Sequence, residues 1–280
     1  MLQLSLFDTN PAPNRPATQG SADVIYADST AILARPSGKL EWLDFTLNPY
    51  QGCTFACTYC YAAFFAPEEE QRERWGQWVR VKTNALAKLR HSRQDVRGKT
   101  VLMSSATDPY QPIEAKLELT RSLLPILAQR GAHLSVLSRS PLVTRDIDLF
   151  QTFEHINVTM SITTDSDEVR QRFEPQCASI DRRLQAITQL SNAGLRTSIN
   201  VAPLLPLYDA RAFAERIIAS GVSRVHIGTF HETRGPFASG TRQPALAIAR
   251  EMGWTEERRE LVAAELRGYL NQATHHRFAA

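Results

Sequence analysis

Three cysteines within eight residues are the feature that most restricts this chain. Cys53, Cys57 and Cys60 lie in the stretch Asn-Pro-Tyr-Gln-Gly-Cys-Thr-Phe-Ala-Cys-Thr-Tyr-Cys-Tyr, with the spacing C-x3-C-x2-C. So high a density is uncommon in a reduced chain unless the thiolates bind something. Three thiolates on one loop can bind three irons of a four-iron four-sulfur cube and leave the fourth iron open. The spacing therefore predicts an iron–sulfur site with one metal corner available to a second ligand.

Two other uses of these cysteines follow from the same spacing rules. A zinc site as a rule needs four ligands, and because Cys177 is far away in sequence, His91 or another group would have to complete it. A disulfide framework fits less well, since three neighbouring cysteines and one distant cysteine pair poorly and no export signal is present. The iron–sulfur cluster is the preferred interpretation.

Length and composition add few limits. With 280 residues and 43% hydrophobic content, the chain can bury one large core, and α/β barrels of this size usually form a single domain. The formal charge of +3 says little about partners, but residues 72–99 hold nine Lys or Arg against two acidic residues. This stretch is a candidate phosphate contact, although a solvated helix face, partly balanced by the glutamates at 68–70, is preferred. Without a long apolar run or a signal segment, we expect no membrane span and a cytoplasmic location.

Strand-like and helix-like segments alternate from about residue 40 onward. The predicted strands cover residues 43–47, 100–104, 133–138, 156–163, 197–202 and 224–230. The predicted helices cover residues 84–91, 114–130, 180–192, 209–220 and 255–271, with another beginning near Thr144. Ser179 or Asp181 is the expected cap of one helix and Asp209 of another, whereas residues 68–78 are expected to be a helical or irregular connection. Six strands alternating with helices favour parallel βαβ units.

The cysteine loop resembles that of the radical S-adenosylmethionine (SAM) superfamily, including the aromatic Tyr59 directly before the third cysteine. The segments 48–52, 61–62 and 107–110 resemble the group related to spore photoproduct lyase, and the resemblance runs from about residue 45 to about residue 230. It implies a [4Fe-4S] cluster whose open iron binds SAM, and an α/β fold with a partial (βα)6 TIM-type barrel. It also implies that an electron, from a reductase, flavodoxin- or ferredoxin-type donor, cleaves SAM to a 5'-deoxyadenosyl radical that removes a hydrogen atom from a substrate.

In such barrels the chemistry lies at the carboxyl ends of the strands, and this rule selects candidate residues. The resemblance implies that the loop after the second strand holds the amino group of SAM, with Asp108 adding a charge and serving as a candidate catalytic residue. Tyr59 is expected to cover the cluster or the adenine, and Tyr61 to relay a hydrogen atom, although packing is an alternative for both. The other candidate SAM contacts are Ser104, Ser105 and Thr107, Ser161 and Thr163 for the ribose, Arg172 for the carboxylate, and Asn200 for adenine or ribose.

Simple structural roles compete with several of these assignments. Asp108 could belong to an ordinary Asp-Pro turn, and Arg172 could form a surface ion pair with Glu174. His226, on the sixth strand, is more often a structural than a catalytic histidine, and the same holds for His231 after it. Cys177 lies in a loop before a helix and is not expected to replace the additional cysteine of the lyase.

A damaged or modified nucleic acid is the favoured substrate class, on the basis of the resemblance, the basic stretch and the N-terminal segment described next. Spore photoproduct itself is not predicted, because the C-terminal part is shorter than a duplex-binding, base-flipping enzyme would need. The alternatives are a peptide or small metabolite as substrate, or a non-catalytic iron–sulfur protein that carries electrons or senses redox state.

Residues 1–22 are proline-rich and are expected to form a flexible tail, with residues 23–280 forming the radical SAM core domain and its C-terminal closing helix. Within the tail, Gln3-Leu4-Ser5-Leu6-Phe7 resembles the pentapeptide with which bacterial polymerases and repair proteins dock onto the sliding clamp. An extended segment of this kind can bury its apolar side chains in a preformed groove. The alternative is that the same side chains dock on the barrel of this protein.

Overall fold

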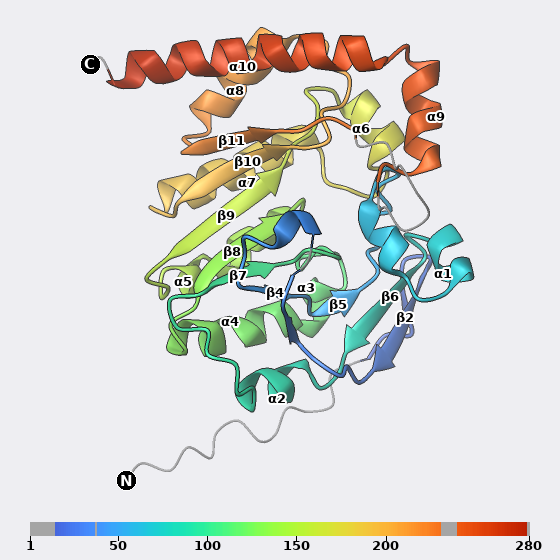
Figure 1. The fold of residues 1–280 in the computed structure, drawn as a ribbon, viewed down its shortest axis with the longest axis vertical. Coiled ribbons are helices and arrows are strands. Elements are labelled where there is room, and N and C mark those ends of the chain that lie inside the picture. The colour runs from blue at the N-terminus through green and yellow to red at the C-terminus, as the bar shows by residue number, and fades with distance from the viewer. Residues whose placement is uncertain (1–14, 37, 231–239, 279–280) are drawn as a thin grey trace.

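Six parallel strands form the main sheet of the protein (Figure 1). The computed structural model describes residues 15–36, 38–230 and 240–278. The strand order is β11-β10-β9-β8-β7-β4-β3, with β3 antiparallel to β4. The strands are β3 (Leu33–Ala34), β4 (Phe45–Leu47), β7 (Thr100–Met103), β8 (His133–Ser138), β9 (Ile156–Ser161), β10 (Thr197–Val201) and β11 (Arg224–Ile227). Among the described residues the edge strands β11 and β3 do not pair with each other, so the predicted partial barrel is confirmed.

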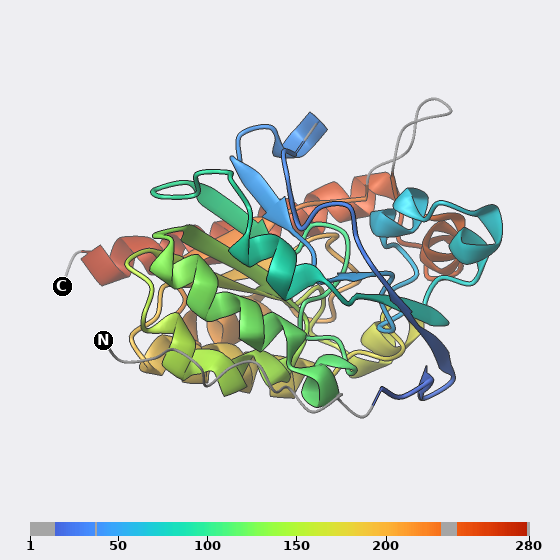
Figure 2. The ribbon, with the colours of Figure 1, turned by 90° about the horizontal axis from the view of Figure 1, so that it is seen from below.

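From β7 to β11, the helices between neighbouring strands lie on one side of the sheet, as the view from below shows (Figure 2). The main helices are α2 (Ala85–Arg90), α4 (Leu119–Gln129), α7 (Ile180–Asn192), α8 (Ala210–Ala219), α9 (Gln243–Glu251) and α10 (Glu256–Phe278). Shorter ones are α1 (Glu69–Glu73), α3 (Glu114–Leu117), α5 (Ile147–Phe150) and α6 (Asp167–Phe173), with 3-10 turns η1 (Gly38–Leu40), η2 (Tyr61–Phe65) and η3 (Pro141–Asp146). The predicted caps are present, since Ser179 accepts the N–H of Arg182 and Asp209 accepts that of Ala212.

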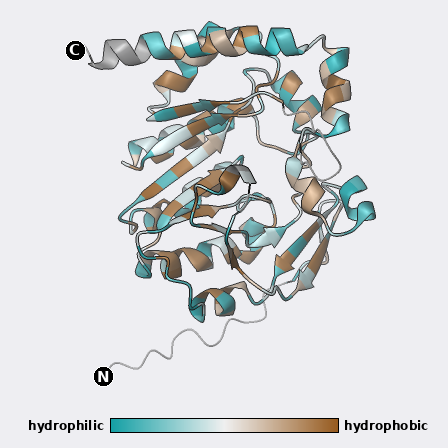
Figure 3. Ribbon diagram, in the orientation of Figure 1, coloured by the Kyte–Doolittle hydropathy of each residue, from teal (hydrophilic) through white to brown (hydrophobic). Residues whose placement is uncertain are grey.

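The two faces of the sheet differ in polarity. Apolar and polar residues alternate along β8, β9 and β10, as their banding shows (Figure 3). One set, including Val136, Val158 and Val201, is fully buried. The other set, including Ser135 and Asn157, lines a cavity. Because successive side chains of a strand point to opposite faces, the sheet has an apolar face and a polar inner face.

A second, smaller sheet and a broken helix depart from the sequence prediction. The strands β1 (Thr18–Gln19), β2 (Ala22–Ala27), β6 (Trp78–Lys82) and β5 (Tyr50–Gln51) pair in that order, so β1 lies inside the segment expected to be a tail. The predicted helix 114–130 is interrupted at Glu118, whose φ is 49°. The side chain of Glu114 accepts the N–H groups of Thr120 and Arg121, which replaces the missing helical bonds at the start of α4.

None of the helices in the described part of the chain is long and apolar enough to cross a membrane.

Candidate active site

The three cysteines lie on a loop at the carboxyl end of β4. The loop passes through β5 and ends where η2 begins. Two turns fold it, since the N–H of Ala56 donates to the carbonyl of Cys53 at 3.4 Å and the N–H of Cys60 to the carbonyl of Cys57 at 3.2 Å. Cys53 and Cys57 are buried, Cys60 is half-buried, and all three are free thiols. The loop therefore occupies the end of the barrel at which active sites form.

Glycine is required directly before the first cysteine. Gly52 has a φ of +76°, and a Cβ atom there would lie 2.7 Å from the ring of Trp78. Only glycine adopts this conformation without strain and tolerates so close an approach. The glycine at position 52 thus allows the loop to pack directly against Trp78 of strand β6.

The thiols are close enough to influence one another. Burial raises the pKa of Cys53 well above its usual range, and the charges of Asp108, Cys57 and Cys60 add to this effect. Burial, followed by the charge of Cys57, raises the pKa of Cys60 to about 11. Because iron binds thiolates, metal binding would have to overcome these shifts. Three mutually interacting thiols are the donor set that a cluster needs.

The arrangement differs from that of a site for a single metal ion. In the residues that the structure describes, no group of three or more His, Cys, Asp or Glu side chains is gathered as the ligands of one ion. In a four-iron cube each thiolate binds its own iron, so the sulfurs need not converge on one point. The loop fits this second kind of ligand set.

A fourth cysteine lies beside the loop. The Sγ atom of Cys177 is 3.8 Å from the Sγ atom of Cys57, and both side chains are buried. This hydrogen-bond contact is the first cause that lowers the pKa of Cys57 below its ordinary value. Sequence reasoning treated Cys177 as separate from the loop, because 120 positions divide the two residues.

Gln111 and Thr107 attach the cysteine loop to the loop that follows β7. The amide nitrogen of Gln111 donates to the carbonyl of Gly52 at 3.3 Å and to Thr107 Oγ1 at 2.9 Å, while its amide oxygen accepts the N–H of Thr54 at 3.0 Å. Thr107 itself donates to the carbonyl of Gly52 at 2.6 Å. Since Gly52 and Thr54 flank Cys53, these bonds fix the first ligand. Thr107, a predicted SAM contact, therefore bonds to the cysteine loop.

Ser105 and Tyr61 are joined at the same corner. Asn48 accepts the N–H of Ser105 at 3.0 Å and donates to its Oγ at 3.1 Å. The hydroxyl of Tyr61 donates to the carbonyl of Ser105, and burial raises the pKa of this tyrosine to about 12. The predicted SAM contact and the predicted hydrogen-atom relay are thus neighbours.

The carboxylate of Asp108 is buried at the carboxyl ends of β7 and β8, close enough to Cys53 for its charge to add to the effect of burial on the pKa of that thiol. This carboxylate accepts the N–H of Tyr110 at 2.9 Å, the hydroxyl of Ser138 at 2.8 Å and the N–H of Arg139 at 2.7 Å. Burial raises its pKa, although these bonds oppose the shift. Asp108 therefore connects the carboxyl ends of β7 and β8.

Tyr59 is anchored to the buried carboxylate of Glu174, for which a surface ion pair with Arg172 was the alternative in the sequence analysis. Its hydroxyl donates to Glu174, which also accepts the hydroxyl of Thr163 at 2.8 Å and pairs with Arg183 at 2.5 Å. The guanidinium of Arg139 lies 5.6 Å from the centre of the Tyr59 ring. Burial opposes ionisation of Glu174, but Arg183 and Arg139 hold its pKa below the usual value. Thr163, predicted to contact ribose, is bonded within this cluster.

Arg172 lies away from this cluster. Its guanidinium pairs with Glu251 on α9, so the alternative pair with Glu174 is not formed. Arg139 and Arg183, which the sequence analysis did not select, lie close enough to Cys57 to lower its pKa, after the contact with Cys177. No local pattern signals them, because their partners are distant in sequence.

Ser104 and Ser161 have free hydroxyls at the carboxyl ends of β7 and β9. Both are buried, and among the described residues neither Oγ atom has a hydrogen-bond partner. A buried polar atom without a partner is costly unless a ligand or water supplies one. In register, Ser161 lies beside Asn200 on β10, which in turn lies beside His226 on β11. Of the predicted SAM contacts, Ser104, Ser161 and Asn200 are thus left to receive a polar ligand.

A large cavity occupies the polar inner face of the barrel. Its volume is about 1450 Å³, and Trp42, 76% exposed, lies at its edge. Its polar lining includes Thr100, Ser135, Asn157, Thr159, Ser198 and Asn200. Closed barrels fill this space with branched apolar side chains. Here it remains open to a polar ligand.

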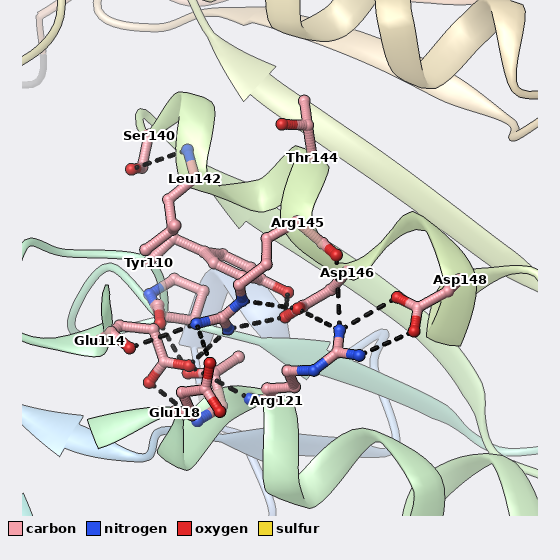
Figure 4. A network of polar contacts seen from close by, with 12 residues as sticks. Tyr110, Glu114, Glu118, Arg121, Ser140, Leu142, Thr144, Arg145, Asp146 and Asp148 are labelled. Carbon is pink, nitrogen blue, oxygen red and sulfur yellow. Dashed lines mark hydrogen bonds and ion pairs between the residues drawn. The ribbon is translucent and has the colours of Figure 1, made fainter. Parts of the chain in front are cut away.

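A buried polar network supports the cysteine loop from the α3–α4 corner (Figure 4). Tyr50, three residues before Cys53, donates its hydroxyl to Glu114, which pairs with Arg145 at 2.8 Å. Arg145 and Arg121 both pair with Asp146 at 2.7 Å. The two Pro-Tyr segments noted in the sequence thus use their tyrosines for structure, since Tyr110 also donates to Asp146, at 2.9 Å.

Comparison with known proteins agrees with this geometry. Residues 47–217 match the radical SAM superfamily, and the chain belongs to that superfamily. Membership implies a [4Fe-4S] cluster, as the cysteine spacing predicted, and SAM, as the resemblance implied, and it indicates an enzyme.

Relatives are known from archaea, bacteria and a phage. An uncharacterized protein of Methanocaldococcus jannaschii, MJ0683, is 36% identical over 170 residues, covering 60% of this chain and 63% of that protein. The uncharacterized protein Rv2578c of Mycobacterium tuberculosis is 32% identical over 211 residues, covering 69% and 61%. A protein of Pseudomonas phage M6 named radical SAM Nalpha-GlyT isomerase is 28% identical over 229 residues, covering 76% and 44%. The chain therefore spans less than two thirds of the length of these relatives.

Solved structures share the fold. Spore photoproduct lyase with bound AdoMet and dinucleoside spore photoproduct superposes with a TM-score of 0.57 at 17% identity, covering 89% of this chain and 79% of that one. SuiB of Streptococcus suis bound to S-adenosylmethionine gives a TM-score of 0.50 at 14% identity, covering 81% and 47%. At these identities the likeness concerns the fold alone.

Proposed function

We propose that this protein is a radical SAM enzyme that removes a hydrogen atom from a nucleoside unit of a damaged or modified nucleic acid. The observation that carries the proposal is the cavity of about 1450 Å³ on the inner face of the barrel whose carboxyl end bears the cysteine loop. A nucleoside is small enough to enter a cavity of this size.

The lining of the cavity combines hydrogen-bonding groups with charged side chains, among them Arg196, Arg224 and Glu260. Ser198 Oγ donates to Asn157 at 2.9 Å, and Asn157 in turn donates to Thr159 at 2.9 Å, so the inner face presents a row of hydroxyl and amide groups. Such groups supply both donors and acceptors, which match the edges of a nucleobase. The exposed ring of Trp42 at the edge offers a stacking surface.

The comparisons support the same substrate class. The spore photoproduct lyase structure holds a dinucleoside lesion, and the phage relative is named an Nalpha-GlyT isomerase.

The residues of this chain would have separate roles in the reaction. Cys53, Cys57 and Cys60 would hold the cluster, which supplies the electron that cleaves SAM. Gln111 fixes the loop, and the free hydroxyls of Ser104 and Ser161 would orient SAM. The barrel wall would keep the substrate in place and exclude water from the radical.

We further propose three partners that the sequence suggested. A reductase, flavodoxin- or ferredoxin-type protein would supply the electron, nucleic acid would be the substrate, and a sliding clamp would bind the segment 3–7, which lies outside the described residues. A peptide spanning residues 1–12 should bind purified clamp at micromolar concentration, and Leu6→Ala with Phe7→Ala should abolish the binding. Absence of binding by the natural peptide would rule out the sliding clamp as a partner of this segment.

Anaerobic reconstitution tests the activity. The reduced protein with SAM should produce 5'-deoxyadenosine, and DNA or nucleosides deuterated at candidate positions should transfer label to that product. Cys60→Ala is the negative control. A protein with a full cluster that leaves SAM intact would instead be an electron carrier or redox sensor. Label transfer only from peptides or small metabolites would contradict the substrate class.

A further inference from the structure

Cys177 is held rigidly against one of the three predicted ligands. Its N–H donates to the carbonyl of Glu174 at 3.1 Å, and its carbonyl accepts the guanidinium of Arg170 at 2.9 Å. Arg170 is itself fixed by Asp167 at 2.6 Å. The backbone around Cys177 is therefore determined by three bonds, and its side chain is left at 3.8 Å from the sulfur of Cys57. The contact is part of a fixed structure.

The other two ligand sulfurs receive a different kind of hydrogen bond. Burial raises the pKa of Cys53 and of Cys60, and the backbone N–H groups of Phe55 and Ala62, each two residues further on, act against that shift. The contact of Cys57 is with a thiol that arrives from a distant part of the chain. The three ligand sulfurs thus differ in the groups that lie beside them.

The direction of the bond follows from the chemistry of the ligand. Between two free thiols either sulfur could donate. A cysteine bound to iron is a thiolate and has no proton to give, so it can only accept. Cys177 must then be the donor.

Resting on the cluster of the proposed function, we propose that the Cys177 thiol donates a hydrogen bond to the Cys57 sulfur and makes the bound cluster easier to reduce. A reduced cluster carries one more negative charge, part of it on the ligand sulfurs. A donor at one sulfur stabilises that charge, and hydrogen bonds to the sulfurs are among the factors that set cluster potentials. Cys177 is a positioning residue in this scheme, because it acts through Cys57.

Packing is the competing explanation, since a buried cysteine often behaves as a small apolar side chain. Two pairs of Cys177 variants, each with members of similar size, distinguish hydrogen bonding from packing. Cys177→Ser and Cys177→Thr keep a donor, whereas Cys177→Ala and Cys177→Val do not. Val169→Ala is a matched control, because it removes a buried side chain from α6 without touching a sulfur.

The measurement is a redox titration followed by electron paramagnetic resonance on the reconstituted protein, without SAM or substrate. At the potential where the natural protein is half reduced, the ratio of reduced to oxidised cluster should fall about fivefold in the Ala and Val variants, as expected for loss of one hydrogen bond. The Ser and Thr variants and Val169→Ala should stay within about twofold. Iron content per chain is measured in every sample.

Equal ratios in all variants, or equal losses in Ser and Ala, would overturn the role of the thiol. If one donor-free variant does not retain iron, the other makes the same comparison. If neither retains iron while Ser and Thr do, the donor is required for the cluster itself. If the natural protein binds no cluster, the failure is that of the proposed function, so the two outcomes are distinct.

Discussion

The side-chain oxygen of Gln111 accepts the backbone N–H of Thr54 at 3.0 Å, and this bond ties the residue after the first cysteine to the loop that follows the neighbouring strand β7. Gln111 is fully buried, and its amide nitrogen bonds to Gly52 on the other side of Cys53. One side chain therefore holds both neighbours of a predicted ligand.

Gln111→Glu should weaken cluster retention. The carboxylate can still accept from Thr54, but it cannot donate to Gly52, and a buried carbonyl that loses its donor costs about 1–3 kcal/mol. Iron release from the reconstituted protein to a chelator should be roughly fivefold faster or more. Gln151→Glu is the control, because Gln151 makes one exposed bond to Ala193. Equal release rates would mean that Gln111 does not support the loop.

Because of Glu174, the free energy of unfolding of the cluster-free protein should decrease at acidic pH. The folded pKa of Glu174 lies below the usual value of 4.5, because Arg183 and Arg139 outweigh burial. A depressed carboxyl pKa contributes stability that is present above the unfolded pKa and is lost as pH falls through the folded pKa. Urea unfolding should therefore show a free energy of unfolding that decreases below about pH 4.5.

Glu174→Gln should remove that part of the pH dependence and lower stability at pH 7 by about 3–5 kcal/mol, since Arg183 would be buried without its counter-charge. Glu215→Gln, on an exposed pair with Arg211, should change stability by less than about 1 kcal/mol. A pH profile of Glu174→Gln that parallels the natural protein would contradict the assignment.

Ser161→Ala should weaken SAM binding if its free hydroxyl receives the cofactor. Loss of one neutral hydrogen bond corresponds to about 1 kcal/mol, or roughly a fivefold higher Kd for SAM. Calorimetry with cluster-loaded protein measures it. Ser220→Ala, whose hydroxyl bonds to Ile217 at the end of α8, should leave Kd unchanged. An unchanged Kd in Ser161→Ala would remove this residue from the SAM site.

Asn157→Ala should separate SAM cleavage from substrate reaction. Asn157 lies on the inner face of the barrel and joins Ser198 to Thr159. We expect a higher KM for the nucleoside substrate, by about tenfold, with 5'-deoxyadenosine formation in the absence of substrate unchanged. Asn192→Ala, at the exposed end of α7, is the control. Loss of both activities in Asn157→Ala would place the defect in folding or in SAM binding.

The sequence by itself determined the local features of this protein. The spacing of Cys53, Cys57 and Cys60 limits what the loop can bind, because the ligand positions are set within a few covalent bonds of each other. The alternation of apolar runs and glycine-ended helices predicted the six parallel strands, since these patterns depend on residues close together in the chain. Caps such as Asp209 were predicted for the same reason.

Only the tertiary structure decided which distant residues meet. Tyr59 and Glu174 are 115 positions apart, and Cys57 and Cys177 are 120 apart, so no local pattern reports either contact. The strand β6 was not predicted, because the charged residues around it do not form a strand pattern. It is stabilised by its pairing with β2 and β5. Asp108 follows β7, yet its carboxylate accepts bonds from Ser138 and Arg139 at the end of β8, 30 and 31 positions further along the chain. Contacts of this kind depend on the order of strands in the folded sheet, and that order is a property of the whole chain.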